Sequence, residues 1–258
     1  MIAVRKENSG QFSKMQITDK IENFEILDGA IDLQVHVGPD VVPRLVDAIE
    51  LVEQARAAGM GGVLIKDHVT LTSDRAYLLN RIFPDFKVFG AIALNYPVGG
   101  LNAQAVRAAI RHGVKQVYIP TFSAANDIRL NGRRKDAFAS FVPRDEQEGI
   151  SILDAQGNMR PEMKDILSAV AEADVALGTG HLSPIEILRL IPEALKAGVK
   201  KIIVTHPLSR SVNMSISEQD CAISSGAMIE YSYLNCMPAN SSEPSINLRI
   251  MADMIKKN

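Results

Sequence analysis

The sequence predicts an α/β protein, a single-domain (β/α) barrel of the TIM type, distorted and with seven or eight strands. One observation is that short apolar runs rich in Val and Ile alternate with longer amphipathic segments. A second is that polar residues capable of chemistry end nearly every apolar run. The alternation indicates a parallel sheet whose strands are joined by helices, and site residues at the carboxyl ends of strands are typical of barrel enzymes.

Seven apolar runs are predicted to be strands. Their apolar residues are continuous, which indicates burial on both faces of the sheet. The runs are Ala30–Val37, Gly62–Lys66, Val88–Leu94, Gln116–Ile119, Val175–Gly178, Lys201–Thr205 and Ala227–Tyr231. A doubly wound open sheet is the alternative, but no Gly-x-Gly-x-x-Gly motif follows the first run, which favours the barrel.

Helices are predicted in the amphipathic segments around these runs. A glycine follows several of them, at the position where a left-handed residue ends a helix. The segments are Leu45–Ala58, Leu101–His112, Pro161–Ala173, Pro184–Ala197, Ser217–Ser225 and Ser245–Lys256.

The pattern divides the chain into an N-terminal extension, residues 1–29, and the barrel, residues 30–258. Residues 121–160 interrupt the alternation with a polar stretch that has only short apolar pieces. Loops of this length are usually functional or mobile. Because the stretch follows the fourth predicted strand, we expect a lid over the site, with a solvated surface decoration as the alternative. Charged residues there, including Asp127, are expected to be solvated.

Composition excludes several partners. The formal net charge is -2, so we expect no electrostatic attraction to nucleic acid or to an anionic membrane surface. No apolar run approaches the roughly 20 residues that cross a bilayer, and the first residues do not resemble a secretory signal. Two cysteines are too few for a disulfide framework, so the simplest expectation is a cytoplasmic protein. The expected partner is a small-molecule substrate. The apolar residues of the last helix leave a homo-oligomer open.

Histidine placement is the strongest functional signal. Four of the five histidines, His36, His68, His181 and His206, follow or end predicted strands, whereas His112 lies at a helix end. A single buried histidine is usually a core residue, but four at equivalent positions would each need a partner in an apolar barrel. Converging imidazoles with one carboxylate, here Glu230, are suited to a divalent metal.

Several motifs resemble those of the amidohydrolase superfamily. The stretch Asp32-Leu33-Gln34-Val35-His36 resembles the Asp-x-His-x-His opening of that superfamily and of PHP-type phosphoesterases, and Lys66-Asp67-His68 resembles a PHP motif. His181 and His206 look like the ligand histidines of amidohydrolase strands five and six. The whole set is similar to an uncharacterised family of amidohydrolase-related proteins. The resemblance implies a distorted barrel and a divalent metal, but no substrate.

One position departs from the resemblance. Gln34 stands where the first motif has its first histidine, and an amide oxygen is a weak metal ligand. We therefore expect one ion, with zinc favoured and manganese or iron as alternatives. The expected ligands are His36, His181 and His206, with His68 or Glu230 completing the shell.

The predicted function is hydrolysis of an amide, lactone or ester bond in a small polar substrate by metal-activated water. Glu230 or His68 is the expected general base, and Lys66 the expected oxyanion or substrate contact, unless it pairs with Asp67 or Asp32. The remaining candidate substrate-binding residues are Gln34, Arg44, Arg75 and Asn95.

Three alternatives remain open on the same fold. A metal-dependent decarboxylase or carbon–carbon lyase would use no attacking hydroxide. A catalytically degenerate barrel would only bind a small molecule, as Gln34 allows. A lyase could instead form a Schiff base at Lys66, because a desolvated lysine beside other cations is a nucleophile.

Overall fold

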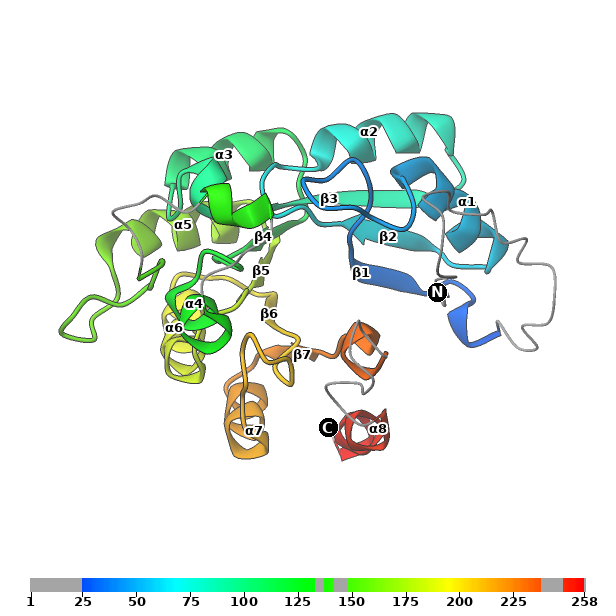
Figure 1. Ribbon diagram of the computed structural model, residues 1–258. Coiled ribbons are helices and arrows are strands. Elements are labelled where there is room, and N and C mark those ends of the chain that lie inside the picture. Colours follow the sequence, from blue (N-terminus) through cyan, green and yellow to red (C-terminus); the bar gives the residue numbers. More distant parts are fainter. Residues whose placement is uncertain (1–24, 133–136, 142–147, 238–247, 258) are drawn as a thin grey trace.

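Seven parallel strands form one curved sheet in which the strand order follows the chain, as a barrel requires (Figure 1). The computed structural model describes residues 25–132, 137–141, 148–237 and 248–257. All seven predicted strands are present. Their bounds are β1 Ile31–Val35, β2 Gly62–Ile65, β3 Lys87–Ala93, β4 Gln116–Tyr118, β5 Ala176–Gly178, β6 Ile202–Thr205 and β7 Met228–Glu230.

Helices cover the outer side of the curved sheet (Figure 1). Their bounds are α1 Ala48–Ala57, α2 Ser73–Ile82, α3 Ala103–Arg111, α4 Ala125–Asn131, α5 Pro161–Glu172, α6 Pro184–Lys196, α7 Ile216–Ser224 and α8 Leu248–Lys257. Short 3-10 turns are η1 Glu25–Leu27, η2 Tyr96–Val98, η3 Ala137–Phe141 and η4 Tyr233–Cys236. None of the helices in the described part of the chain is long and apolar enough to cross a membrane.

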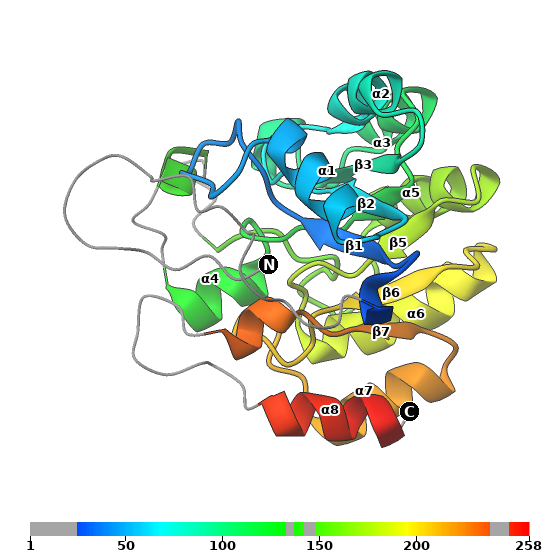
Figure 2. The same ribbon diagram turned by 90° about the vertical axis from the view of Figure 1, so that its right-hand side faces the viewer.

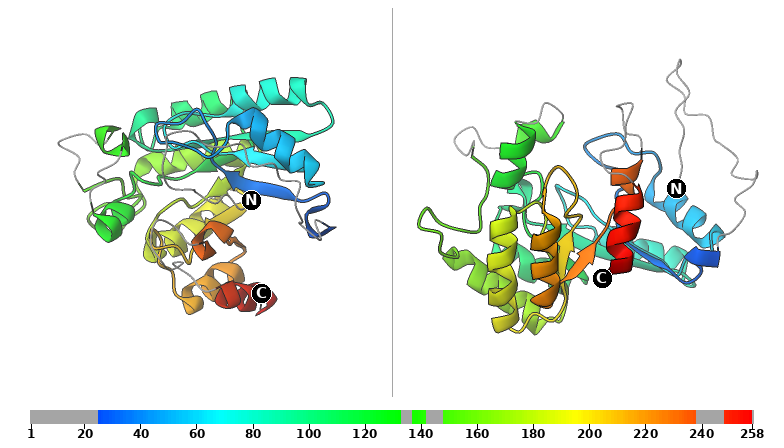
Figure 3. Two further views of the ribbon diagram at one scale, coloured as in Figure 1. Left: turned by 45° about the vertical axis from the view of Figure 1, so that its right-hand side comes forward. Right: turned by 90° about the horizontal axis from the view of Figure 1, so that it is seen from below.

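The sheet is a partial barrel. Each strand from β2 to β6 pairs with neighbours on both sides, whereas no pairing joins β7 to β1 among the described residues. The four residues of β2 and of β6 are all buried, but Ile31 and Leu33 of β1 are 41% and 44% exposed. Seen from below, α8 lies between α7 and the β1 side of the molecule (Figure 3).

The apolar core packs the helices against the sheet in two clusters. Its larger cluster joins β3, β4, β5 and β6 to α3, α5, α6 and α7, while a second cluster packs β2 between α1 and α2. Three helices begin with a capping box, formed by Asp47 at the start of α1, Ser183 at the start of α6 and Ser215 at the start of α7.

The segment predicted as a lid is partly built into the fold. It contains α4 and η3, and Ala124 pairs with Ile150 in an isolated parallel bridge. Residues 133–136 and 142–147 of this segment, and most of the predicted N-terminal extension, lie outside the described residues. Both α4 and η4 lie at the carboxyl-terminal ends of the strands, where the site residues gather (Figure 2).

Candidate active site

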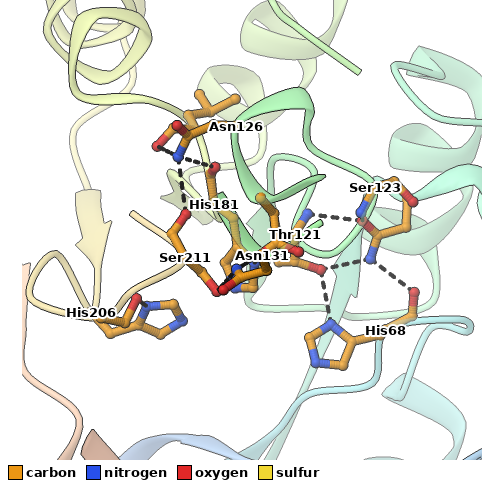
Figure 4. A network of polar contacts seen from close by, with 12 residues as sticks. His68, Thr121, Ser123, Asn126, Asn131, His181, His206 and Ser211 are labelled. Carbon is orange, nitrogen blue, oxygen red and sulfur yellow. Dashed lines mark hydrogen bonds and ion pairs between the residues drawn. The ribbon is translucent and has the colours of Figure 1, made fainter. Parts of the chain in front are cut away.

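Four histidines meet at the carboxyl-terminal ends of four strands. The ring of His36, after β1, stacks on that of His68, after β2, with 4.6 Å between centroids. The ring of His181, beyond β5, lies 6.4 Å from His68 and 5.0 Å from the ring of His206, beyond β6. Figure 4 shows His68, His181 and His206 from close by. The structure thus brings together the four histidines that the sequence singled out, whereas His112 ends α3 at the surface.

A tight turn after β5 places His181. Gly180 has a φ of +59°, and a Cβ there would lie 2.2 Å from the carbonyl oxygen of Ile119, so only glycine fits. The turn is further fixed by a bond from the His181 amide to the Pro120 carbonyl, 2.9 Å. Any side chain at position 180 would therefore displace the His181 ring.

Asp127 on α4 holds the His181 ring from behind. Its Oδ1 lies 3.1 Å from His181 Nδ1, and Asp127 is 1% exposed. An ionised carboxylate only accepts hydrogen bonds, so Nδ1 is the donor, and a neutral ring then has its lone pair on Nε2. This carboxylate–imidazole pair is the arrangement that orients metal-binding histidines.

The burial of Asp127 corrects the expectation that charged residues of this segment are solvated. Asn126 fastens α4 to the site, because its Nδ2 donates to the carbonyls of His181, 3.2 Å, and Ser211, 3.0 Å (Figure 4). Neither residue stands out in the sequence, since a polar pair in a polar stretch has no apolar pattern to mark its burial. The signal is present only in the fold.

His206 is held by a local turn. Its backbone has a φ of 27°, and its Nδ1 lies 2.8 Å from Ser209 Oγ, which the same turn brings back toward the ring. Burial lowers the pKa of His206 well below 6.5, and the neighbouring His181 lowers it further. The imidazole is therefore neutral at pH 7, the form that binds metals.

Asn95 and Thr121 connect His68 to the centre of the sheet. Thr121 Oγ1 lies 2.8 Å from His68 Nδ1 and accepts a 2.7 Å hydrogen bond from Asn95 Nδ2. Asn95 also donates to the His68 carbonyl and accepts from the amides of Thr121 and Ser123. Asn95, a predicted substrate contact, is fully buried, and the hydrogen bonds just described join its side chain to protein groups and not to a substrate site. Burial lowers the pKa of His68 well below 6.5.

Lys66 and Glu230 interact electrostatically on the other side of the site. Lys66 is 1% exposed, and its Nζ lies 4.1 Å from the centroid of the Tyr118 ring. Burial lowers the pKa of Lys66 to about 8, an effect that the negative charge of Glu230 opposes. Burial likewise raises the pKa of Glu230 to about 7, opposed by Lys66. Both groups therefore titrate near neutral pH.

Several polar atoms on this side have no hydrogen-bond partner among the described residues. They belong to side chains that the sequence assigned to metal or substrate binding. The atoms are Gln34 Oε1, His36 Nδ1, Lys66 Nζ and Glu230 Oε2. Burial lowers the pKa of His36 well below 6.5, and the charge of Lys66 acts in the same direction.

The two arginines form ion pairs with nearby carboxylates. Arg44 binds Asp40 at 2.6 Å, and Arg75 binds Asp67 at 2.9 Å. Because Asp67 is taken by Arg75, it is not the partner of Lys66. The positive charge of Arg44 still lowers the pKa of His36 and of His68, so Arg44 lies near these two rings.

Residues 29–230 match the model of a protein family described only as a family of unknown function, DUF6282. The chain belongs to this family. No curated protein matches the chain.

Two solved structures share a general likeness. A probable 2-pyrone-4,6-dicarboxylic acid hydrolase from Acinetobacter baumannii, solved with citric acid bound, has 10% identity and a TM-score of 0.43, over 89% of this chain and 91% of that one. An amidohydrolase from Pseudomonas aeruginosa has 11% identity and a TM-score of 0.49, and the match covers 81% of this chain and 63% of the amidohydrolase chain.

The donor set fits a divalent cation in its chemistry. It offers imidazoles held neutral by burial, a histidine oriented by a buried carboxylate, and unpartnered atoms on His36 and Glu230. Within the described residues, however, no three His, Cys, Asp or Glu side chains stand close enough together to hold an ion. Metal binding therefore requires side chains of the cluster to move toward one another.

Proposed function

We propose that this protein is a metal-dependent hydrolase of small polar substrates with an amide, lactone or ester bond. The observation that carries the proposal is the His181–Asp127 pair within a cluster of four histidines from four strands. A buried carboxylate that fixes the tautomer of an imidazole is costly in a core, and it is useful where Nε2 must present a lone pair.

The proposed ligands of a single ion are His36, His181 and His206, completed by His68 or Glu230. When bound, such an ion lowers the pKa of a coordinated water from about 15.7 toward about 7 and polarises a carbonyl. Zinc is the proposed ion, with manganese or iron as alternatives. Asp127 and Ser209 orient two of the imidazole rings through their Nδ1 atoms, and the ligand side chains still have to move toward one another when the ion binds.

Proton transfer is assigned to Glu230. A carboxyl group with a pKa of about 7 accepts and returns protons at neutral pH, as a general base must. Lys66, buried beside it, stabilises negative charge that develops on the substrate oxygen. If Glu230 binds the ion instead, His68 is the remaining base, since burial keeps its ring neutral and able to accept a proton, although the lowered pKa makes it a weaker base than Glu230.

Metal content tests the proposal. We expect the purified or reconstituted protein to bind one divalent ion per chain, by elemental analysis. His181→Ala and His206→Ala should lose most of it, and Asp127→Asn should weaken affinity about 10- to 100-fold. The control, His112→Ala, should bind normally because His112 is at the surface. No metal in the reconstituted wild type, or equal loss in the control, would contradict the proposal.

Gln34→His offers a gain-of-function test. An imidazole at the position beside His36 should raise metal affinity or add a second ion, whereas Gln34→Asn should not. The reaction is tested by supplying metal-loaded protein with amides, lactones, esters and carboxylic acids. A new carboxylate would support hydrolysis. Release of CO2 would instead show decarboxylation, the second candidate function, which the buried cation of Lys66 favours.

A further inference from the structure

Besides His36 Nδ1, three polar atoms on or directly after strands β1, β2 and β7 have no hydrogen-bond partner among the described residues. They are Gln34 Oε1, Lys66 Nζ and Glu230 Oε2, and each is buried without a hydrogen bond in the described part of the chain. Buried polar groups in folded proteins almost always have a partner, so each exception needs a physical reason. Here three exceptions come from neighbouring parts of one site.

The fold itself does not supply the missing partners. Asp67, next to Lys66 in sequence, is held by Arg75. No ion pair within 4.0 Å joins Lys66 to Glu230 among the described residues, although each alters the pKa of the other. Besides the charge of Glu230, the ammonium meets the face of the Tyr118 ring, whose hydroxyl donates to the Leu33 carbonyl. Charge–ring attraction does not replace hydrogen bonds to three ammonium protons.

Gln34 is placed by an irregularity in β1. The pairing of β1 with β2 shifts register between Asp32 and Val35, and the Gln34 amide donates to Asp32 Oδ1 at 2.9 Å. Irregularities of this kind re-aim side chains and are frequent beside active sites. Like Glu230 Oε2, the side-chain oxygen of Gln34 is a buried acceptor without a hydrogen bond in the described residues.

We propose that Lys66, Glu230 and Gln34 form a subsite for a small carboxylate or carbonyl compound that carries a hydroxyl or amino group next to that function. The ammonium of Lys66 only donates, so it binds the carboxylate or carbonyl oxygen. The Glu230 carboxylate and the Gln34 oxygen accept, so they bind the hydroxyl or amino hydrogens. The Tyr118 ring lies against the ammonium, with 4.1 Å from Nζ to the ring centroid, so a ligand approaches Nζ from another side.

This subsite rests on the proposed function in one respect, since it selects the substrate of the same site. It does not need the metal, because none of its three atoms depends on a bound ion for its place. A ligand that satisfies all three atoms removes the cost of leaving them buried and unpaired. A ligand that lacks the hydroxyl or amino group leaves two acceptors unsatisfied and binds more weakly.

Malate and succinate provide a matched pair of probes, because they differ by one hydroxyl group. We expect chelator-treated protein to bind one enantiomer of malate at least tenfold more tightly than succinate, by isothermal titration, and to show a larger rise in Tm with it. Gln34→Leu should reduce this preference, and Lys66→Met should abolish binding of both acids. Lys115→Met, an exposed lysine before β4, is the matched control and should bind as the wild type does.

The outcomes separate the subsite from the hydrolase. Equal affinity for malate and succinate in the wild type, no binding of either, or unchanged binding in Lys66→Met would overturn the subsite, even if the protein holds a metal. A malate preference without any metal binding would support the subsite and contradict the proposed hydrolase. The wild-type comparison stands even if a variant fails to fold, which circular dichroism would reveal.

Discussion

The two sides of the histidine cluster differ in how their polar atoms are satisfied. On one side, His68, His181 and His206 each have an Nδ1 bonded to an oxygen, from Thr121, Asp127 and Ser209. On the other side the atoms without a hydrogen bond belong to Gln34, His36, Lys66 and Glu230. The first side is organised by the protein alone, and the second has polar groups that a ligand can satisfy.

The position in the sheet accounts for the difference at β1 and β7, whereas β2, an interior strand, is followed both by Lys66 and by His68. Partners on the satisfied side come from the segments after β3, β4 and β6, and α4 adds Asp127. The unsatisfied atoms lie on or beside β1, β2 and β7, and both β1 and β7 are edge strands of the open sheet. An edge strand has one neighbour in place of two, so fewer groups are at hand to complete its hydrogen bonds. We therefore expect a ligand to bind on the side of β1 and β7, where polar atoms are still without partners among the described residues.

The largest effect is expected from the satisfied side. Asn95→Ala removes four hydrogen bonds, three of them fully buried, and leaves the His68 carbonyl and the amides of Thr121 and Ser123 without their Asn95 partner. Because an unsatisfied buried group costs about 1–3 kcal/mol, we expect a loss of about 4 kcal/mol in the free energy of unfolding. Urea unfolding measures it.

Asn80→Ala is the matched control for this change. Asn80 is exposed, and its side-chain hydrogen bonds within the described residues are to the backbone of Val88, so its loss should cost about 1 kcal/mol. Similar losses in the two variants would mean that the Asn95 network is no more important to the fold than a surface contact.

The sequence predicted the fold better than it predicted these partners. Continuous apolar runs are marked by composition, and all seven became strands. The ends of those strands placed His36, His68, His181, His206 and Glu230 on one side of the sheet. Asp127 could not be found in this way, because its burial depends on how α4 folds back over β5. The pairing of Arg75 with Asp67, eight residues apart, likewise depends on a turn whose geometry the sequence does not show.

The unsatisfied side should respond in the opposite direction to removal of its polar groups. Replacing a buried charge pair by apolar residues is often stabilising by about 1–4 kcal/mol. We therefore expect the double variant Lys66→Met/Glu230→Leu to gain about 2 kcal/mol in the free energy of unfolding while losing function. Urea unfolding of the chelator-treated protein measures the gain.

The exposed ion pair of Lys201 and Asp174 provides the control, since Lys201→Met/Asp174→Asn should change stability by less than about 1 kcal/mol. A large loss of stability in the Lys66/Glu230 double variant would show that the pair supports the fold, and the contrast between the two sides would fail.

The pH dependence of stability should follow the neutral histidines. Burial holds the pKa of His36, His68 and His206 well below 6.5. On acidification these histidines therefore bind protons in the unfolded chain at a pH where they are still neutral in the folded protein. The unfolded state then binds more protons, and stability falls as the pH drops below 6.5, by about 1.4 kcal/mol per histidine for each pH unit. Unfolding of metal-free protein between pH 8 and pH 5 measures this. His36→Gln should lower the slope by one proton and His112→Gln should not, whereas equal slopes in wild type and His36→Gln would contradict the burial of a neutral ring.

The smallest effect is expected at Ser209. Ser209→Ala removes the oxygen that holds His206 Nδ1, and one neutral hydrogen bond contributes about 1 kcal/mol. Ser224→Ala, at the exposed end of α7, should cost nothing measurable. Because the ring of His206 would be freer to rotate, metal affinity should fall more than stability does, by about tenfold. A variant that loses stability but keeps full metal affinity would place Ser209 in the fold alone, and would remove one of the three contacts that distinguish the satisfied side.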